Sequence, residues 1–231
     1  LVSDTIRYSF LDVQNANTFE LPQLIQFRGQ GEHLSTIKLA DANERFDAGS
    51  HRAVIEIMGG VRTNAAFHNS VEDLTIDVGS GNPGAVGLDF FSDNTGAVRR
   101  VTVRSSDPDR RGSCGLAIRH LDSSCAFFQD VTVEGFDYGI HIGYPYVNTT
   151  IEHATVRGQL VSGVHVDRHN VSLRGLRSEN EVPALTVTGS QAMVAFIDGE
   201  LSGGGALNPA IDLRDGHLFV RNVDCDGYEC A

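Results

Sequence analysis

Val71-Glu-Asp-Leu74-Thr-Ile76 decides the fold, because its pattern returns in Val98-Arg-Arg-Val101-Thr-Val103, Phe128-Gln-Asp-Val131-Thr-Val133 and Ile151-Glu-His-Ala154-Thr-Val156. Each copy reads apolar, two polar residues, apolar, Thr, apolar. Looser copies begin at Leu173, Phe196 and Val220, so the unit repeats every 22 to 30 residues along the chain. A fixed period of this length is typical of solenoid proteins.

A second series of short strands lies between these copies. Each member has Gly or Ala followed by an apolar, a variable and an apolar residue, an alternation that buries one face and leaves the other wet. The small residue marks a predicted bend, where a Cβ atom would crowd the turn. The members are Val86-Gly-Leu-Asp-Phe90, Cys114-Gly-Leu-Ala-Ile118, Tyr138-Gly-Ile-His-Ile142, Ser162-Gly-Val-His-Val166, Pro183-Ala-Leu-Thr-Val187 and Pro209-Ala-Ile-Asp-Leu213.

Two repeating strands per unit predict an all-β, right-handed parallel β-helix. One coil cannot bury its own apolar face, so neighbouring coils complete the core, and the right hand follows the rule for parallel crossovers. We expect one domain over residues 1–231, with irregular early coils in 1–70 and regular coils in 71–231. The early coils contain predicted strands at 5–8, 25–31, 35–39 and 53–57. Both ends look like cuts through a longer protein, which predicts a fragment lacking its end caps.

The amino-acid composition argues against some classes of binding partner. The net charge of −12 over 231 residues opposes nucleic acids and anionic membranes, and no apolar run approaches the length of a membrane span. A local patch of Arg and His can still bind a polyanion. The four cysteines show no metal-ligand spacing, and both local disulfides and reduced thiols remain open. The sequence gives no indication of oligomeric state.

Outward rows of side chains follow from the alternation. In the first series, one row reads Thr75, Thr102, Thr132, Thr155, Arg177, Glu200, Asp224, and the next alternates in charge as Asp77, Arg104, Glu134, Arg157, Glu179. We interpret these as scaffold, since opposite charges on neighbouring strands stabilise a sheet. In the second series, the rows read Asp89, Ala117, His141, His165, Thr186, Asp212 and Phe91, Arg119, Gly143, Asp167, Thr188, Arg214.

The second series carries the candidate site. The predicted catalytic residues are His141, His165, Asp167 and Arg119, because imidazole moves protons near neutral pH and guanidinium grips a sugar carboxylate. A simpler interpretation is that the histidines are polar residues on a wet strand. The predicted substrate-binding residues are Tyr144, Tyr146, Arg168, His169 and Asp89.

Weaker signals lie elsewhere. Asn148-Thr-Thr150 and Asn170-Val-Ser172 match the N-glycosylation pattern. The turn at residues 107–112 is a substrate-facing loop, a calcium-binding carboxylate pair or a solvated turn. We predict no metal site and no cofactor, with calcium the ion to consider if the chain is a lyase.

Several segments resemble the pectate lyase superfamily, in the branch related to family 28 glycoside hydrolases and, more distantly, to family 55. The resemblance rests on Asn69-Ser-Val-Glu-Asp-Leu-Thr-Ile-Asp77, Gly81-Asn-Pro-Gly-Ala-Val-Gly-Leu-Asp-Phe90, Gly135-Phe-Asp-Tyr-Gly-Ile140, and Gly29-Gln-Gly31 with Ser35-Thr-Ile-Lys-Leu39. It implies a right-handed β-helix and a secreted or cell-surface enzyme that cleaves polysaccharide by hydrolysis or β-elimination.

The family's catalytic signatures are absent. N-T-D, D-D, G-H-G and R-I-K do not occur as such, and a chain without Trp cannot hold the Trp-containing signature of classical pectate lyases. No catalytic residue is therefore carried over from the family. The leading hypothesis is an extracellular polysaccharide-degrading enzyme, either glycoside hydrolase or polysaccharide lyase. The alternative is a non-catalytic carbohydrate-binding β-helix, such as an adhesin or tailspike-like module.

Overall fold

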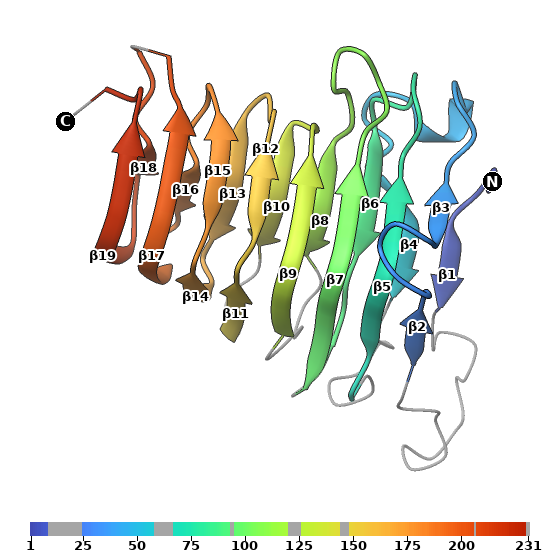
Figure 1. The fold of residues 1–231 in the computed structure, drawn as a ribbon, viewed down its shortest axis with the longest axis horizontal. Helices are drawn as coiled ribbons and strands as arrows, with labels where there is room; N and C mark the ends of the chain where they lie inside the picture. Colours follow the sequence, from blue (N-terminus) through green and yellow to red (C-terminus); the bar gives the residue numbers. More distant parts are fainter. Residues whose placement is uncertain are drawn as a thin grey trace.

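The computed structural model describes residues 1–8, 25–57, 67–92, 95–119, 126–143, 148–205 and 207–229. The chain winds into a parallel β-solenoid whose coils stack side by side from the N-terminus to the C-terminus (Figure 1). The predicted all-β parallel solenoid is therefore confirmed. No helix in the described ranges has the length and apolar character needed to cross a membrane.

The first sheet contains the strands of the second series. All its pairings are parallel. Its eight strands, in spatial order, are β1 (Ile6–Tyr8), β4 (Arg52–Ile57), β6 (Ala85–Asp89), β8 (Cys114–Ile118), β10 (Tyr138–Gly143), β13 (Ser162–Asp167), β16 (Leu185–Thr188) and β18 (Ile211–Leu213).

The second sheet contains the copies of the six-residue repeat and faces the viewer in Figure 1. A short 3₁₀ helix, η1 (Glu44–Phe46), precedes β4. The eleven strands are β2 (Gln26–Arg28), β3 (Thr36–Lys38), β5 (Ser70–Asp77), β7 (Gly96–Arg104), β9 (Ala126–Glu134), β11 (Asn148–Glu152), β12 (Thr155–Arg157), β14 (Asn170–Arg174), β15 (Arg177–Asn180), β17 (Met193–Gly203) and β19 (His217–Asp226).

The backbone turns sharply at the two polar residues of the repeat, and we call this turn the corner. The second polar residue has a positive φ in successive coils, so it turns the strand and restarts the alternation. The corner residues and their φ angles are Asp73 (59°), Arg100 (51°), Asp130 (52°), His153 (54°), Gly175 (66°), Asp198 (57°) and Asn222 (51°).

Opposite charges pair along this corner. Asp73 accepts from Arg28 Nε at 2.9 Å and from Arg100 Nε at 2.5 Å, and the hydrogen bond from Arg100 lowers the pKa of Asp73. Exposed pairs contribute only about 0.2–1 kcal/mol each, whereas a left-handed non-glycine residue costs roughly 1–2 kcal/mol. The ion pairs alone therefore do not hold the bend. Backbone hydrogen bonds between coils also hold it, such as His153 N to Arg174 O at 2.9 Å.

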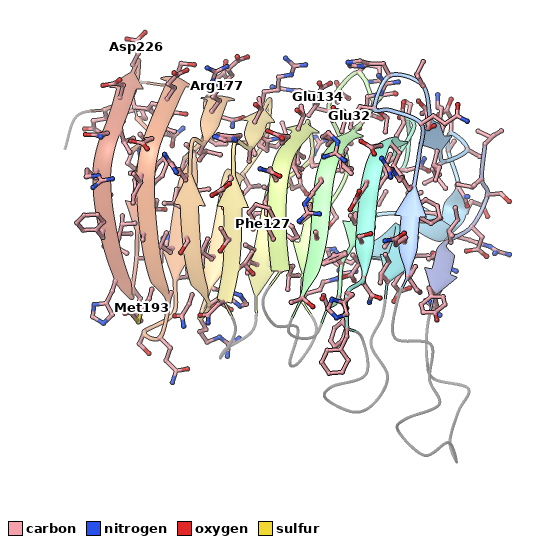
Figure 2. All side chains as sticks on the ribbon, turned by 60° about the horizontal axis from the view of Figure 1, so that its bottom comes forward. Glu32, Phe127, Glu134, Arg177, Met193 and Asp226 are labelled. Atoms are coloured by element: carbon pink, nitrogen blue, oxygen red, sulfur yellow. The ribbon has the colours of Figure 1, made fainter. Side chains whose placement is uncertain are left out.

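The strand register confirms the predicted scaffold rows. Thr75, Thr102, Thr132 and Thr155 are direct partners on successive strands. In the neighbouring row, Arg104 Nε lies 3.0 Å from Asp77 Oδ2, and Arg157 pairs with Glu134. Glu32, at the upper edge of Figure 2, accepts from Thr102 Oγ1 at 3.1 Å. The outer face of this half of the sheet is thus occupied by its own cross-strand contacts.

One continuous core fills the space between the sheets. Its largest buried side chains are aromatic, and Phe90 packs edge-to-face on Phe128 with ring centroids 5.9 Å apart. The aromatic residues come from several coils, as a solenoid core requires. Phe46, Phe90, Phe128, Phe136 and Phe196 are all fully buried.

The small residues of the second series lie where the two sheets approach each other. A Cβ on Gly87 would lie 2.2 Å from Val103 Cγ1. A Cβ on Gly115 would lie 2.2 Å from Val133 Cγ1 and 2.8 Å from Gly139 O. A Cβ is excluded at these positions, as predicted, but the predicted bend is wrong: Gly87 and Gly115 lie inside β6 and β8, and the crowding comes from the opposite sheet.

We expect Gly115→Ala to lower the free energy of unfolding by about 1–3 kcal/mol, the usual cost of overpacking a filled core. Chemical denaturation measures the change. Gly205→Ala is the matched control, since a Cβ there meets no described atom within 4 Å. Equal stability of the two variants would contradict the close approach of the sheets.

Candidate functional site

The histidines of the second series share one outward row. His141 is the direct partner of Ala117 on one side and of His165 on the other, and His165 is the partner of Thr186. The flanking apolar residues occupy the inward phase: Ile140, Ile142, Val164 and Val166 are fully buried. The structure therefore brings together the two imidazoles that the sequence placed on adjacent coils.

Tyr138 joins the histidines, and the sequence analysis did not include it. Its ring stacks on His141 at 5.4 Å and meets His165 edge-on at 5.4 Å, while the two imidazole centroids lie 4.9 Å apart. We call these three rings the aromatic cluster. Tyr138 packs with Val86, Cys114 and Ala117 in a small hydrophobic group separate from the main core. The glycine after Tyr138 interrupts the alternation, which is why Tyr138 and His141 share a face although they are three residues apart.

Both imidazoles are held in the neutral form. Burial, assisted by the nearby His165, lowers the pKa of His141 to about 4, and burial also lowers the pKa of His165. The Asp167 carboxylate acts in the opposite direction on both pKa values. The cluster therefore contains proton acceptors, and not imidazolium cations, at neutral pH.

Thr188 contacts His165 on the next coil. His165 Nε2 lies 3.1 Å from Thr188 Oγ1, and the Thr188 hydroxyl lies 3.4 Å from Val166 O. His165 Nδ1 is buried and has no hydrogen-bond partner in the described ranges.

Asp167 and Arg168 border the aromatic cluster as an ion pair. Arg168 Nη2 lies 3.1 Å from Asp167 Oδ2, and the Arg168 side chain is about half exposed (53%). Arg168 adopts a positive φ of 57°, which turns the chain immediately after β13. The Arg168 guanidinium therefore lies at the surface beside Asp167, at the end of β13.

Arg119 and Asp89 contact each other. Arg119 Nε lies 2.7 Å from Asp89 Oδ2, and Nη2 donates to His51 O at 2.8 Å. Arg119 thus turns toward the earlier coils, although its charge still helps to lower the pKa of His141. Asp89 is buried, so this carboxylate is placed to hold Arg119 and not to contact a ligand directly.

His169, a predicted substrate-binding residue, does not join the cluster. His169 is fully buried and its Nε2 lies 3.0 Å from Thr149 Oγ1. The structure does not support substrate binding by His169, because no part of it reaches the surface. Tyr144 and Tyr146 lie outside the described residues.

A basic pocket of about 430 Å³ opens on the same face over the earlier coils. Arg7 pairs with Glu56 (Nε–Oε2 2.7 Å), and Arg52 and Arg45 both pair with Asp4. The guanidinium groups outnumber these carboxylates. The sequence analysis missed this pocket because its residues come from β1, η1 and β4, where the repeat is irregular. Its lining is Arg7, Arg45, Ser50, His51, Arg52, Ala53, Glu56 and Arg119.

The turn at residues 107–112 uses its leading carboxylate internally. Asp107 accepts from the backbone N–H groups of Gly81 and Asp109, at 2.8 and 2.9 Å, and these bonds lower the pKa of Asp107. In the described ranges, no group of three or more His, Cys, Asp or Glu side chains is arranged to hold a metal ion.

Cys114 is not a candidate nucleophile, and Cys225 is an exposed cysteine on β19 of the other sheet. The Cys114 thiol is buried and donates to Leu116 O at 3.3 Å, and burial raises its pKa to about 12. A nucleophilic cysteine requires the thiolate, which this environment disfavours. Cys125 and Cys230 lie outside the described residues, so the disulfide alternative stays a prediction.

Comparisons with known proteins assign no family. No protein-family model matches the chain, and no curated protein matches it either. One solved structure is similar: the A-module of the mannuronan C-5 epimerase AlgE6 of Azotobacter vinelandii, at 11% identity, over 88% of this chain and 83% of that chain, with a TM-score of 0.25. A likeness this weak does not assign a function, which has to come from the site itself.

We expect the His141 ring to titrate with a pKa of about 4 in the folded protein, well below the ordinary 6.5. Because the unfolded chain then binds more protons than the folded one, stability falls as the pH drops from about 6.5 toward 4. NMR titration of the ring measures the pKa, and denaturation across this range measures the linkage.

His141→Gln is the control for this titration. The variant removes the group, so its stability should fall less than that of the original chain between pH 6.5 and pH 4. A pKa near 6.5 for His141 would show that the imidazole is not desolvated.

Proposed function

We propose that this chain is a polysaccharide-degrading enzyme that cleaves an acidic polysaccharide by β-elimination on the outer face of the eight-stranded sheet. One observation carries the proposal: two neutral imidazoles and a phenol form a single cluster, and the charges of Arg119 and Arg214 act on its imidazoles. Such an enzyme acts on extracellular polymers, so a secreted or cell-surface location belongs to the same proposal.

Hydrolysis fits the described side chains less well. A glycosidase needs two facing carboxyl groups, and an inverting or retaining acid must be protonated. The carboxylates of the outward rows are instead each paired with an arginine: Asp89 with Arg119, Asp167 with Arg168 and Asp212 with Arg214. Asp89 and Asp167 are also three coils apart, roughly 14 Å at the usual strand spacing.

Elimination requires groups that this face does contain. A base removes the proton from the carbon next to the sugar carboxylate, a carbon–carbon double bond forms, and the bond to the leaving glycosidic oxygen breaks. An acid then protonates that oxygen. We assign the base to His141, the acid to Tyr138, and neutralisation of the sugar carboxylate to Arg168.

His141 is the better base because of its access. A Cβ on Gly143 would lie 3.5 Å from His141 Nε2 and would meet no other described atom within 4 Å. Within the described residues, no side chain covers that nitrogen from the Gly143 side, and we propose that a sugar ring approaches it there. A bound carboxylate would also raise the pKa of His141 from about 4, strengthening the base when substrate is present.

His165 and Asp167 support the base. His165 contacts His141 in the aromatic cluster, and the Asp167 carboxylate acts to raise the pKa of both imidazoles. The basic pocket, next to the cluster through Arg119, would hold the acid groups of sugars further along the chain. Calcium is an additional cation to test in the assay.

We expect the double variant His165→Ala and Asp167→Ala, and the single variant His141→Gln, to lower turnover by about 10²–10⁴-fold without unfolding the chain. Ultraviolet absorbance of the unsaturated product, over a panel of acidic polysaccharides, measures the reaction. Arg177→Ala, on the other sheet, is the control and should keep full activity. Unaltered turnover in both site variants would refute the assignment.

The low pKa of His141 favours a second candidate function, a non-catalytic carbohydrate-binding module, since a weak base is a poor catalyst. Reducing-end and unsaturated-product assays on the same panel separate the alternatives. Reducing ends without unsaturated product indicate hydrolysis. Silence in both assays with retained polymer binding indicates the module.

A further inference from the structure

A second concave surface lies on the eleven-stranded sheet, over strands β11, β14, β17 and β19. Two outward rows form it, and the register makes their members direct neighbours. The first row is Asn148, Asn170, Met193, His217. The second row is Thr150, Ser172, Ala195, Phe219. We call this surface the trough; its cavity measures about 510 Å³.

An aromatic residue precedes the second row, and another ends it. Phe127 is the direct partner of Thr150 on the preceding strand, and Phe219 is the partner of Ala195 on the following one. Figure 2 shows Phe127 in the middle of this face and Met193 at its lower edge. Phe219 is 57% exposed, and Arg99 lies over the Phe127 ring at 5.4 Å. Small side chains between two rings leave a depression about four coils long, roughly 19 Å.

The lining contains no Asp, Glu, Lys or Arg, in contrast to the site on the other sheet. It consists of Asn148, Thr149, Thr150, Asn170, Val171, Ser172, Met193, Val194, Ala195, His217, Leu218 and Phe219. A charged polymer would lose hydration here without finding a counter-charge. The lining therefore favours an uncharged ligand.

The amides are oriented for hydrogen bonding. Asn170 Nδ2 donates to Asn148 Oδ1 at 3.1 Å, which fixes both side chains. Asn148 Nδ2 and Asn170 Oδ1 remain without a hydrogen-bond partner in the described ranges, one a donor and the other an acceptor. The hydroxyls of Thr150 and Ser172 lie on the same face, so donors and acceptors recur on neighbouring coils.

We propose that the trough binds an uncharged polysaccharide chain running along the solenoid axis. Hydroxyl-rich sugars need paired donors and acceptors, and their apolar faces stack on aromatic rings. The spacing of the coils, about 4.8 Å, is comparable with the length of one sugar in an extended chain, so each coil meets one sugar. This binding is independent of the chemistry proposed for the other sheet.

The test is affinity electrophoresis of the full chain in gels containing an uncharged polymer: a β-1,3-glucan, a β-1,4-glucan, a xylan or a mannan. We expect at least one of these to retard the protein. Asn170→Ala combined with Phe219→Ala should weaken that binding about tenfold or more, as expected from losing one hydrogen bond and one stacking contact.

Leu34→Ala is the matched control, because Leu34 is an exposed apolar residue (77%) outside the trough and should leave binding unchanged. Thermal unfolding verifies that the double variant is folded. The His165→Ala and Asp167→Ala variant should bind normally here, and the trough variant should keep its turnover, so the two proposals fail separately. Retardation by none of the four polymers, or equal retardation of the trough variant, would overturn the inference.

Discussion

The hydrogen-bonded register between successive coils is the constraint on which the rest depends. Each residue is tied to the residue one coil further on, so a change of one position would carry a whole strand's apolar side chains to the wrong face. No coil has a core of its own, and Phe90 and Phe128 meet only because their coils are stacked in register. The same constraint turns His141 and His165 into neighbours whose ring centroids are 4.9 Å apart.

The features of the solenoid that recur with the repeat length could be predicted from the sequence. The threonine row, the adjacent histidines and the crowded glycines all depend on the repeat length and on alternation, which a single sequence displays. The features that the repeat pattern did not predict depend on local backbone geometry. The left-handed corner at Asp73 and its equivalents appears in the sequence only as a second polar residue.

The same limit applies to the site. Tyr138 was missed because Gly139 breaks the alternation, and His169 was misplaced because its strand β14 starts one residue later and leaves the ring buried. The alternation places Arg119 on the outer face of the sheet, but it does not show which way the side chain extends. The long Arg119 side chain reaches back to Asp89, and the pattern of outward rows does not indicate that contact. The basic pocket over the irregular early coils gave no repeating signal at all.

One scaffold presents two chemically different faces. The eight-stranded sheet carries arginines and neutral imidazoles, on a chain whose net charge is −12, while the trough on the eleven-stranded sheet is uncharged.

Disulfide formation tests the register between coils, on which both faces depend. Thr132→Cys with Thr155→Cys, partners on adjacent coils, should form a bond detected by peptide mass spectrometry, since Cα atoms about 4.8 Å apart are within reach. Thr102→Cys with Thr155→Cys, two coils apart, should not. Failure of the adjacent pair, or equal bonding in both, would contradict the stacked register.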